Sequence, residues 1–282
     1  MIESLKKIQD SKILTSPFPH LVVDNFLNKE IVDDLHNEFR ENLNNDELLK
    51  NANKSKEISK NNVKQFGAID LDEKILKETP QFKRSLRVNS FFNSQEFINS
   101  IINKLSGYLS NSSGLNQNYF SQQSNKLNFN SRLCFVPPSE ASKRREIHLD
   151  APNNILIFLY YLRLPEDYSF GGSLNLLSKE ERYLFKSRSK TFLSDLLNIY
   201  PSDLNIEKTY DYIDNRLVVM CSSGFSWHEV STRRYAETPR INFHGGLQTN
   251  ENNNEFTRFY NNKSLAHPLK SKLKYLLNFF NK

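Results

Sequence analysis

The spacing of apolar residues changes along the chain, from a helical repeat near the start to strand-like runs in the centre. Residues 28–42 and 94–109 place apolar side chains every three or four positions, which predicts two amphipathic helices. Ser94 precedes the second helix and is suited to cap its N-terminus. Residues 16–24 are short, apolar and entered through prolines, which favours a strand.

Strand-like segments dominate from about residue 128 onward, and each is short and followed by turn residues. The predicted strands span 127–136, 146–150, 154–164, 171–177, 216–222, 226–231 and 240–247. Several short strands separated by turns are typical of a sandwich or barrel of the jelly-roll type. We therefore expect a mostly β fold with a jelly-roll core, braced by helices at its N- and C-terminal ends.

Three regions are expected from this pattern. Residues 1–127 form a helical and strand-containing support region of the same domain, 128–250 form the β core, and 251–282 form a helical tail. A helical insert near 180–210 interrupts the core. The tail ends in an amphipathic basic helix at 269–280, which we expect to pack on the core and not on a membrane.

The composition is that of an ordinary globular protein of 282 residues, with 38% hydrophobic and 25% charged residues. The chain has no apolar run near the ~20 residues that a membrane-spanning helix needs. Its first residues show neither a signal-peptide apolar stretch nor a small-residue cleavage site. Two cysteines, Cys134 and Cys221, are too few for a disulfide framework, so we expect a reducing, cytoplasmic location.

The net charge of +6 is not concentrated in one basic face, because the lysines are spread along the chain. This excess alone does not indicate nucleic acid as a partner. One local cluster, Lys143-Arg144-Arg145, lies just before the motif described next and could meet an anionic substrate, although a solvated loop is the simpler interpretation.

A His-x-Asp pair and a distant second histidine suggest a metal site. The pair is His148 and Asp150, and the second histidine is His228. Residues two apart on a strand point to the same side, so His148 and Asp150 can hold one ion if a neighbouring strand brings His228 to it. Two imidazoles and one carboxylate on one face of a metal are the ligand set of the non-haem Fe(II) oxygenases.

Arg240 follows His228 by twelve positions, on the next predicted strand. A dicarboxylic co-substrate such as 2-oxoglutarate needs a buried cation for its remote carboxylate, and a guanidinium offers two parallel charge-assisted hydrogen bonds. Arg233 and Arg234 compete for this role, but they fall in a predicted loop. We therefore expect Arg240 to bind the co-substrate.

The segment from about 130 to 247 resembles the catalytic domain of Fe(II)/2-oxoglutarate-dependent dioxygenases, in particular their prolyl-hydroxylase-like branch. The matching pieces are His148-Leu-Asp150, Leu159-Tyr-Tyr-Leu162, Gly171-Gly-Ser-Leu174, Asn215-Arg-Leu-Val-Val219, Trp227-His-Glu-Val230 and Arg240-Ile-Asn242. Residues 17–27 also resemble the N-terminal strand of bacterial members.

The resemblance implies a double-stranded β-helix in which His148, Asp150 and His228 bind Fe(II) and Arg240 holds 2-oxoglutarate. It also implies that Tyr161 assists in binding the co-substrate, with a core aromatic as the alternative reading of that residue. The reaction would use O2, hydroxylate a small molecule, glycan or peptidyl side chain, and release succinate and CO2. The carboxylate of Asp150 favours hydroxylation, since related halogenases lack it.

Three departures from the family are visible. The interval from Asp150 to His228 is 78 residues, which the insert near 180–210 explains. Asn242 and His244 stand where the family often has Ser or Thr after the arginine. Nucleic-acid demethylases carry a second Arg six residues after the first, and here that position is Gly246, so we do not expect a role in DNA repair.

Three other functions remain open from the sequence. The same triad could hold Zn²⁺ and an activated water in a metal hydrolase, although Arg240 would then have no role. A non-catalytic jelly-roll binding module gains nothing from an intact triad. A nucleic-acid binder would need stacking aromatics on a basic surface, and the chain shows no such motif.

Overall fold

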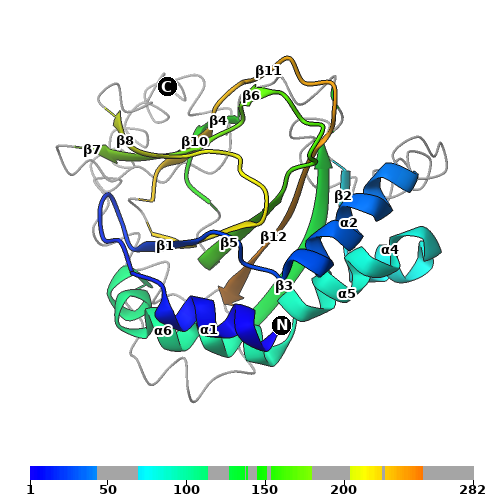
Figure 1. Cartoon of the computed structure of the whole chain (residues 1–282). Helices are drawn as coiled ribbons and strands as arrows, with labels where there is room; N and C mark the ends of the chain where they lie inside the picture. The colour runs from blue at the N-terminus through cyan, green and yellow to red at the C-terminus, as the bar shows by residue number, and fades with distance from the viewer. Residues whose placement is uncertain are drawn as a thin grey trace, which may run out of the picture.

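Two antiparallel sheets form the centre of the computed structural model (Figure 1). The structure describes residues 1–42, 69–113, 127–136, 138, 145–150, 154–179, 204–223 and 226–249. The large sheet has the order β1-β9-β5-β12-β3-β2 and the small sheet the order β4-β10-β7-β8. The strands of the large sheet are β1 (His20–Val23), β2 (Ile69–Leu71), β3 (Leu127–Val136), β5 (Asn154–Leu162), β9 (Arg216–Cys221) and β12 (Arg240–Thr249). Those of the small sheet are β4 (Arg145–His148), β7 (Leu174–Lys179), β8 (Leu204–Tyr210) and β10 (His228–Val230).

The order of the strands identifies the fold. From β3 to β12 the chain passes between the sheets: β3 is in the large sheet, β4 in the small, β5 in the large, β7 and β8 in the small, β9 in the large, β10 in the small and β12 in the large. This winding, with antiparallel neighbours throughout, is that of a jelly roll. The predicted double-stranded β-helix core is therefore confirmed.

The helices lie against the outer face of the large sheet (Figure 1). They are α1 (Ile2–Asp10), α2 (Lys29–Asn42), α4 (Glu73–Glu78), η1 (Pro80–Phe82), α5 (Lys83–Phe92) and α6 (Gln95–Ser113). Phe92 of α5 is fully buried, and its ring lies 5.0 Å from that of Phe158 on β5 and 5.6 Å from that of Phe243 on β12. Burying one such side chain contributes about 1.5–3 kcal/mol, so this aromatic contact fixes the helices on the sheet.

Strand alternation separates this outer core from the interior of the jelly roll. Ile241 and Phe243 on β12 belong to the cluster that contacts the helices. Arg240, Asn242 and His244 alternate with them and therefore face the small sheet. A second apolar cluster lies on that inner side and includes Tyr161, Leu176 and Tyr212. The polar residues that matter for function thus line the inside of the jelly roll.

The sequence-based expectations for secondary structure were largely confirmed. The predicted helices at 28–42 and 94–109 are α2 and α6, and Ser94 Oγ accepts a hydrogen bond from the Phe97 amide at 3.2 Å, as expected for a cap. Cys134 and Cys221 are buried free thiols. None of the helices in the described ranges is long and apolar enough to span a bilayer.

The expectation for the insert needs correction. The last residues of the predicted helical insert, Leu204–Tyr210, form strand β8, which pairs with β7 along its length. The extended conformation is stabilised there by ladder hydrogen bonds to β7, which a helix would lose. The rest of the insert, the cluster Lys143-Arg144, the segment 251–282 and its predicted helix lie outside the described residues.

Candidate metal centre and anion site

The structure brings the three predicted metal ligands together. His148 ends β4 and His228 begins β10, and the two residues are direct partners in the antiparallel register. Their imidazole rings lie 4.2 Å apart, centre to centre. Asp150 stands two residues beyond the end of β4, so it is the segment after the strand, and not the strand itself, that presents its carboxylate. Donor atoms of the three residues all lie within 4.8 Å of one another.

The contacts of His228 and Asp150 fit a cation. His228 Nδ1 lies 2.9 Å from the carbonyl oxygen of Ser226. Because a carbonyl only accepts, Nδ1 carries a proton, and Nε2 is the ring nitrogen that faces the other two residues. Nε2 lies 3.2 Å from Asp150 Oδ2, which is buried without a hydrogen bond. This contact is favourable when a proton or a metal ion lies between the two atoms.

Arg240 begins β12 and is 8% exposed. Its Cζ atom lies 5.3 Å from the ring centre of Tyr161 and 5.0 Å from that of Tyr212, within the range of cation–π attraction. Within the described ranges, no carboxylate forms an ion pair with this guanidinium. Gly172 lies beside this guanidinium, since a Cβ atom there would be 3.4 Å from Arg240 Nη1, and its φ of 72° is one that other residues rarely adopt. A buried guanidinium without a carboxylate favours an anionic ligand.

Tyr161 lies beside Arg240 on the inner face of β5 and is fully buried. Its hydroxyl oxygen is buried and has no hydrogen-bond partner of ordinary geometry. Burial raises the pKa of this phenol, and the nearby Arg240 guanidinium offsets only part of that effect. The hydroxyl therefore stays protonated at neutral pH and can donate a hydrogen bond to an anion beside Arg240.

Tyr212 helps to fix the position of Arg240, because it joins the two strands that end and begin beside it. Its hydroxyl donates to the carbonyl of Leu162 at 2.8 Å and accepts from the amide of Ile241 at 3.0 Å. The end of β5 and the start of β12 are thereby joined through one side chain. Burial raises the pKa of Tyr212 to about 12, although Arg240 and Arg233 nearby act in the opposite direction.

Arg233 lies in a short strand and not in the loop that the sequence predicted. Arg233–Arg234 forms β11, which pairs with β6 (Phe170–Gly171), and the Arg233 side chain is fully buried while Arg234 is exposed. A two-residue strand carries no readable periodicity, which is why the sequence did not reveal it. One available signal was that adjacent residues in an extended segment point to opposite sides, so one of the two arginines could face inward.

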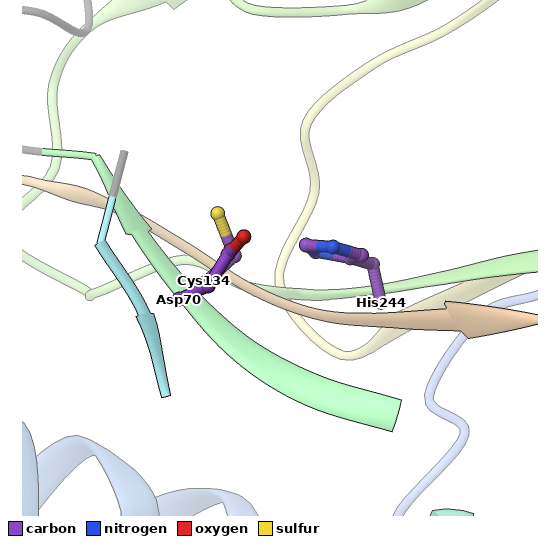
Figure 2. Close-up of side chains that lie close together, drawn as sticks. All are labelled: Asp70, Cys134 and His244. Atoms are coloured by element: carbon purple, nitrogen blue, oxygen red, sulfur yellow. The ribbon is translucent and has the colours of Figure 1, made fainter. Parts of the chain in front are cut away.

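A second group of potential metal donors lies on the inner face of the large sheet (Figure 2). Asp70 on β2, Cys134 on β3 and His244 on β12 place donor atoms within 4.8 Å of one another. Figure 2 shows the carboxylate of Asp70 beside the thiol of Cys134, with the imidazole of His244 across from them. Asp70 and Cys134 are paired in register, which explains their contact.

This second group already contains a cation. Arg132 Nε donates to His244 Nε2 at 2.7 Å, and Arg132 Nη1 lies 3.4 Å from Asp70 Oδ2. The guanidinium supplies the positive charge that a metal ion would bring. Burial, and then the carboxylate of Asp70, raise the pKa of the Cys134 thiol well above its usual value. The thiol is therefore protonated, and we assign no metal to this group.

Comparison with known proteins gives structural neighbours only. No protein-family model and no curated protein match the chain. It is similar to a prolyl-4-hydroxylase from Pseudomonas putida, with 16% identity and a TM-score of 0.43 over 87% of this chain and 98% of that one. It is also similar to a prolyl hydroxylase from Trichoplax adhaerens, solved with a hypoxia-inducible-factor peptide, with 15% identity and a TM-score of 0.43 over 82% and 83% of the two chains. The assignment of the fold rests on the strand order and not on this likeness.

Proposed function

We propose that this chain is an Fe(II)- and 2-oxoglutarate-dependent dioxygenase that hydroxylates a small molecule, a glycan or a peptidyl side chain. One observation carries the proposal: Nε2 of His228 and a buried oxygen of Asp150 face each other at 3.2 Å, with the imidazole of His148 beside them. Such a pair is favourable around a cation or a proton, and two histidines with one carboxylate suit Fe(II).

The three ligands have distinct tasks in this proposal. His148 and His228 would bind the metal as neutral imidazoles, and Asp150 would neutralise one of its charges. The hydrogen bond from His228 Nδ1 to the Ser226 carbonyl holds the ring in the tautomer that can bind a metal. When bound, Fe(II) with its co-substrate and O2 would supply an oxidant strong enough to hydroxylate a C–H bond.

Arg240 and Tyr161 would bind the co-substrate. Arg240 offers two parallel donors to a carboxylate, which adds direction as well as charge. Tyr161 offers one further hydroxyl donor from the same inner face. Because Tyr161 and Tyr212 flank the guanidinium with aromatic rings, water has little access to it and the attraction for an anion is stronger than at the surface.

An anaerobic titration tests the proposal. Metal-free protein is treated with Fe(II) and then with 2-oxoglutarate while visible absorbance is followed. We expect a charge-transfer band that needs both additions and is lost in His228→Ala. His244→Ala is the matched control, since it removes an imidazole of the same inner face that lies in the second group of donors, and it should keep the band.

Other results would lead to other functions. Tight binding of Zn²⁺ with no such band would indicate a metal hydrolase using the same triad. A protein that binds neither metal would be a jelly-roll binding module. Loss of the band in His244→Ala together with its retention in His228→Ala would overturn the ligand assignment.

A further inference from the structure

Three exposed aromatic side chains lie at the short strand pair β6–β11 (Figure 1), and we call them the aromatic surface. Tyr168, Phe170 and Tyr235 are 81%, 69% and 80% exposed, and the rings of Phe170 and Tyr235 lie 6.4 Å apart, edge to face. Ser169 is buried, so Tyr168 and Phe170 point outward from the same side of their extended segment. Among the described residues six large hydrophobic side chains are exposed, and half of them belong to this surface.

The chain holds one of these rings outward in a strained conformation. Tyr235 has a positive φ of 55°, which a residue with a large side chain rarely adopts. Strain of this kind persists only where the surrounding structure imposes it, and it is common at sites that bind a ligand or a partner. Because Tyr235 remains largely exposed, its ring gains little contact within its own chain. The conformation therefore favours a role outside the monomer.

The opposite side of β11 is fixed in the interior. Arg233 Nε donates to Ser169 Oγ at 2.6 Å, and Nη2 donates to Asp167 Oδ2 at 2.7 Å. Gly171 is the register partner of Arg233 and lets the strands approach, because a Cβ atom there would lie 2.1 Å from the carbonyl oxygen of Thr232. The aromatic surface thus has a rigid support, and a partner would bind it with little ordering of the backbone.

The charges beside the aromatic surface are self-complementary. Arg234 and Glu237 are exposed, flank Tyr235 on one segment and carry opposite signs. In an interface with twofold symmetry, every contact from one copy to the other is repeated in return. The cation of each copy can therefore meet the anion of the other around an apolar centre. Aromatic residues and arginine are also the residues enriched in such interfaces.

The exposed area is of the size that a weak dimer needs. An aromatic side chain offers about 150–250 Å², so the aromatic surface exposes on the order of 350–550 Å² on one copy. The same surface on a second copy brings the buried total to about 700–1,100 Å², before the contribution of Arg234 and Glu237. Weak and transient protein complexes bury less than about 1,200 Å².

We propose that the aromatic surface, with Arg234 and Glu237, is the interface of a weak dimer in which two copies of this chain are related by a twofold axis. His228 begins β10, whereas β11 follows that strand. The interface therefore lies beyond the end of β10 that is farther from the metal ligands. Dimerisation and the proposed function are thus independent of each other.

Sedimentation velocity at protein concentrations from about 1 to 300 µM tests the interface. We expect the unmodified protein to pass from monomer to dimer with a Kd of about 10–200 µM, as suits so small an interface. Tyr235→Asn should raise this Kd at least about tenfold, because it removes an aromatic ring from the interface. Asparagine tolerates a positive φ, so this variant should fold. Ile206→Thr is the matched control, since Ile206 is an exposed apolar residue on β8, and it should dimerise normally.

An exchange of charges tests the symmetry of the interface. Arg234→Glu would place like charges opposite each other at both contacts and should raise the Kd about tenfold. The double variant Arg234→Glu/Glu237→Arg restores opposite charges and should return the Kd to within about threefold of the original. Because both changes are in the same chain, such recovery requires that two copies meet through this surface. A double variant that dimerises as weakly as Arg234→Glu overturns the proposed pairing.

Two further results would overturn the inference. One is an unmodified protein that stays monomeric over the whole range, which would leave the aromatic surface to a different partner. The other is a dimer that Tyr235→Asn and Arg234→Glu leave unchanged, since the copies would then meet elsewhere. Circular dichroism verifies that each variant is folded.

The titration with Fe(II) and 2-oxoglutarate separates the interface from the proposed function. If the protein dimerises through the aromatic surface but gives no charge-transfer band, the interface stands and the dioxygenase proposal fails. If it gives the band but remains monomeric, the proposed function stands and the interface is wrong. Tyr235→Asn should keep the band, because Tyr235 points to solvent and not into the jelly roll.

Discussion

Two groups of histidine and acidic side chains lie on the inner faces of this jelly roll, and they balance their charges differently. His148, Asp150 and His228 bring together donor atoms within 4.8 Å, and so do Asp70, Cys134 and His244. In the first group His228 Nε2 and Asp150 Oδ2 face each other at 3.2 Å. In the second, the guanidinium of Arg132 reaches both the imidazole and the carboxylate.

The comparison teaches that closeness of donor atoms does not define a metal site. A site for a cation must also lack a cation of its own. By that criterion the first group takes up a proton or a metal ion between its two facing atoms, whereas the guanidinium of Arg132 already supplies the positive charge of the second group. Four changes would break or sharpen the contrast.

The largest effect on metal binding is expected from Asp150→Ala. It removes the negative charge of the first group, so affinity for Fe(II) should fall at least on the order of 10- to 100-fold, since even outer residues of metal sites have effects of that size. Metal content after dialysis and calorimetry measure this loss. Asp70→Ala removes the corresponding carboxylate of the second group and should leave metal binding intact. Equal loss in both variants would remove the distinction.

Asp167 forms an ion pair with Arg233 of the same chain. Replacing Asp167 therefore tests how much a balanced buried charge contributes to stability where no metal ion is involved. Burial opposes its ionisation, but hydrogen bonds from Ser169 and Arg233 outweigh burial and lower its pKa. Breaking such a buried pair by Asp167→Asn should cost about 3–5 kcal/mol of stability at neutral pH. Denaturant unfolding measures it.

The pH dependence follows from the sign of that shift. Because the folded pKa of Asp167 lies below the unfolded value, its contribution is complete above the unfolded pKa and disappears as the pH falls through the folded pKa. Acid should therefore destabilise the unmodified protein more steeply than Asp167→Asn. Parallel stability curves for the two proteins would contradict this account.

Arg132→Ala should turn the second group toward metal binding. Without the guanidinium, Asp70 and His244 lose their cation, and we expect affinity for Co²⁺ at Cys134 to rise about tenfold or more, as for any lost competing charge of about 1.4 kcal/mol. A near-ultraviolet band from thiolate to Co²⁺ reports on this group alone, since the first group has no cysteine. The band should vanish in Arg132→Ala/Cys134→Ser. The same band in the unmodified protein would show that the second group binds metal as it stands.

The smallest effect concerns the reactivity of Cys134. The carboxylate of Asp70 is one of the causes that raise the pKa of this thiol, so Asp70→Asn should lower that pKa and increase the rate of alkylation a few-fold at pH 8. Cys221 is the control, because burial alone raises its pKa to about 12. Mass spectrometry after iodoacetamide treatment distinguishes the two thiols. Equal acceleration at both cysteines would point to loosening of the fold instead.

The sequence predicted those parts of the fold that depend on local periodicity. The bounds of β3 were predicted without error, and α2 and α6 were found within a few residues. Helices α4 and α5 were not predicted, because Pro80 and the short turn η1 interrupt the repeat between them. The jelly-roll class followed from the number of short strands, whereas the order of strands in each sheet appeared only in the structure.

The residues of the candidate site also divide into those that the sequence indicates and those that only the structure reveals. His148, Asp150, His228 and Arg240 could be selected from residue types and spacing. The burial of Arg233 depends on the pairing of β11 with β6, and the position of Arg132 depends on its register opposite His244. Both pairings join segments far apart in sequence, so local alternation could at most indicate that one of Arg233 and Arg234 faces inward.

The position of His148 has a consequence for how the protein folds around its ligand. Strand β4 has four residues and lies at the edge of the small sheet, with β10 as its neighbour in that sheet. A metal ion held by His148 and His228 would crosslink this edge strand to the interior of the sheet. Binding of the ion and stable pairing of β4 with β10 would then occur together. In the metal-free protein, local opening of this pair would let the β4 amide hydrogens exchange with solvent.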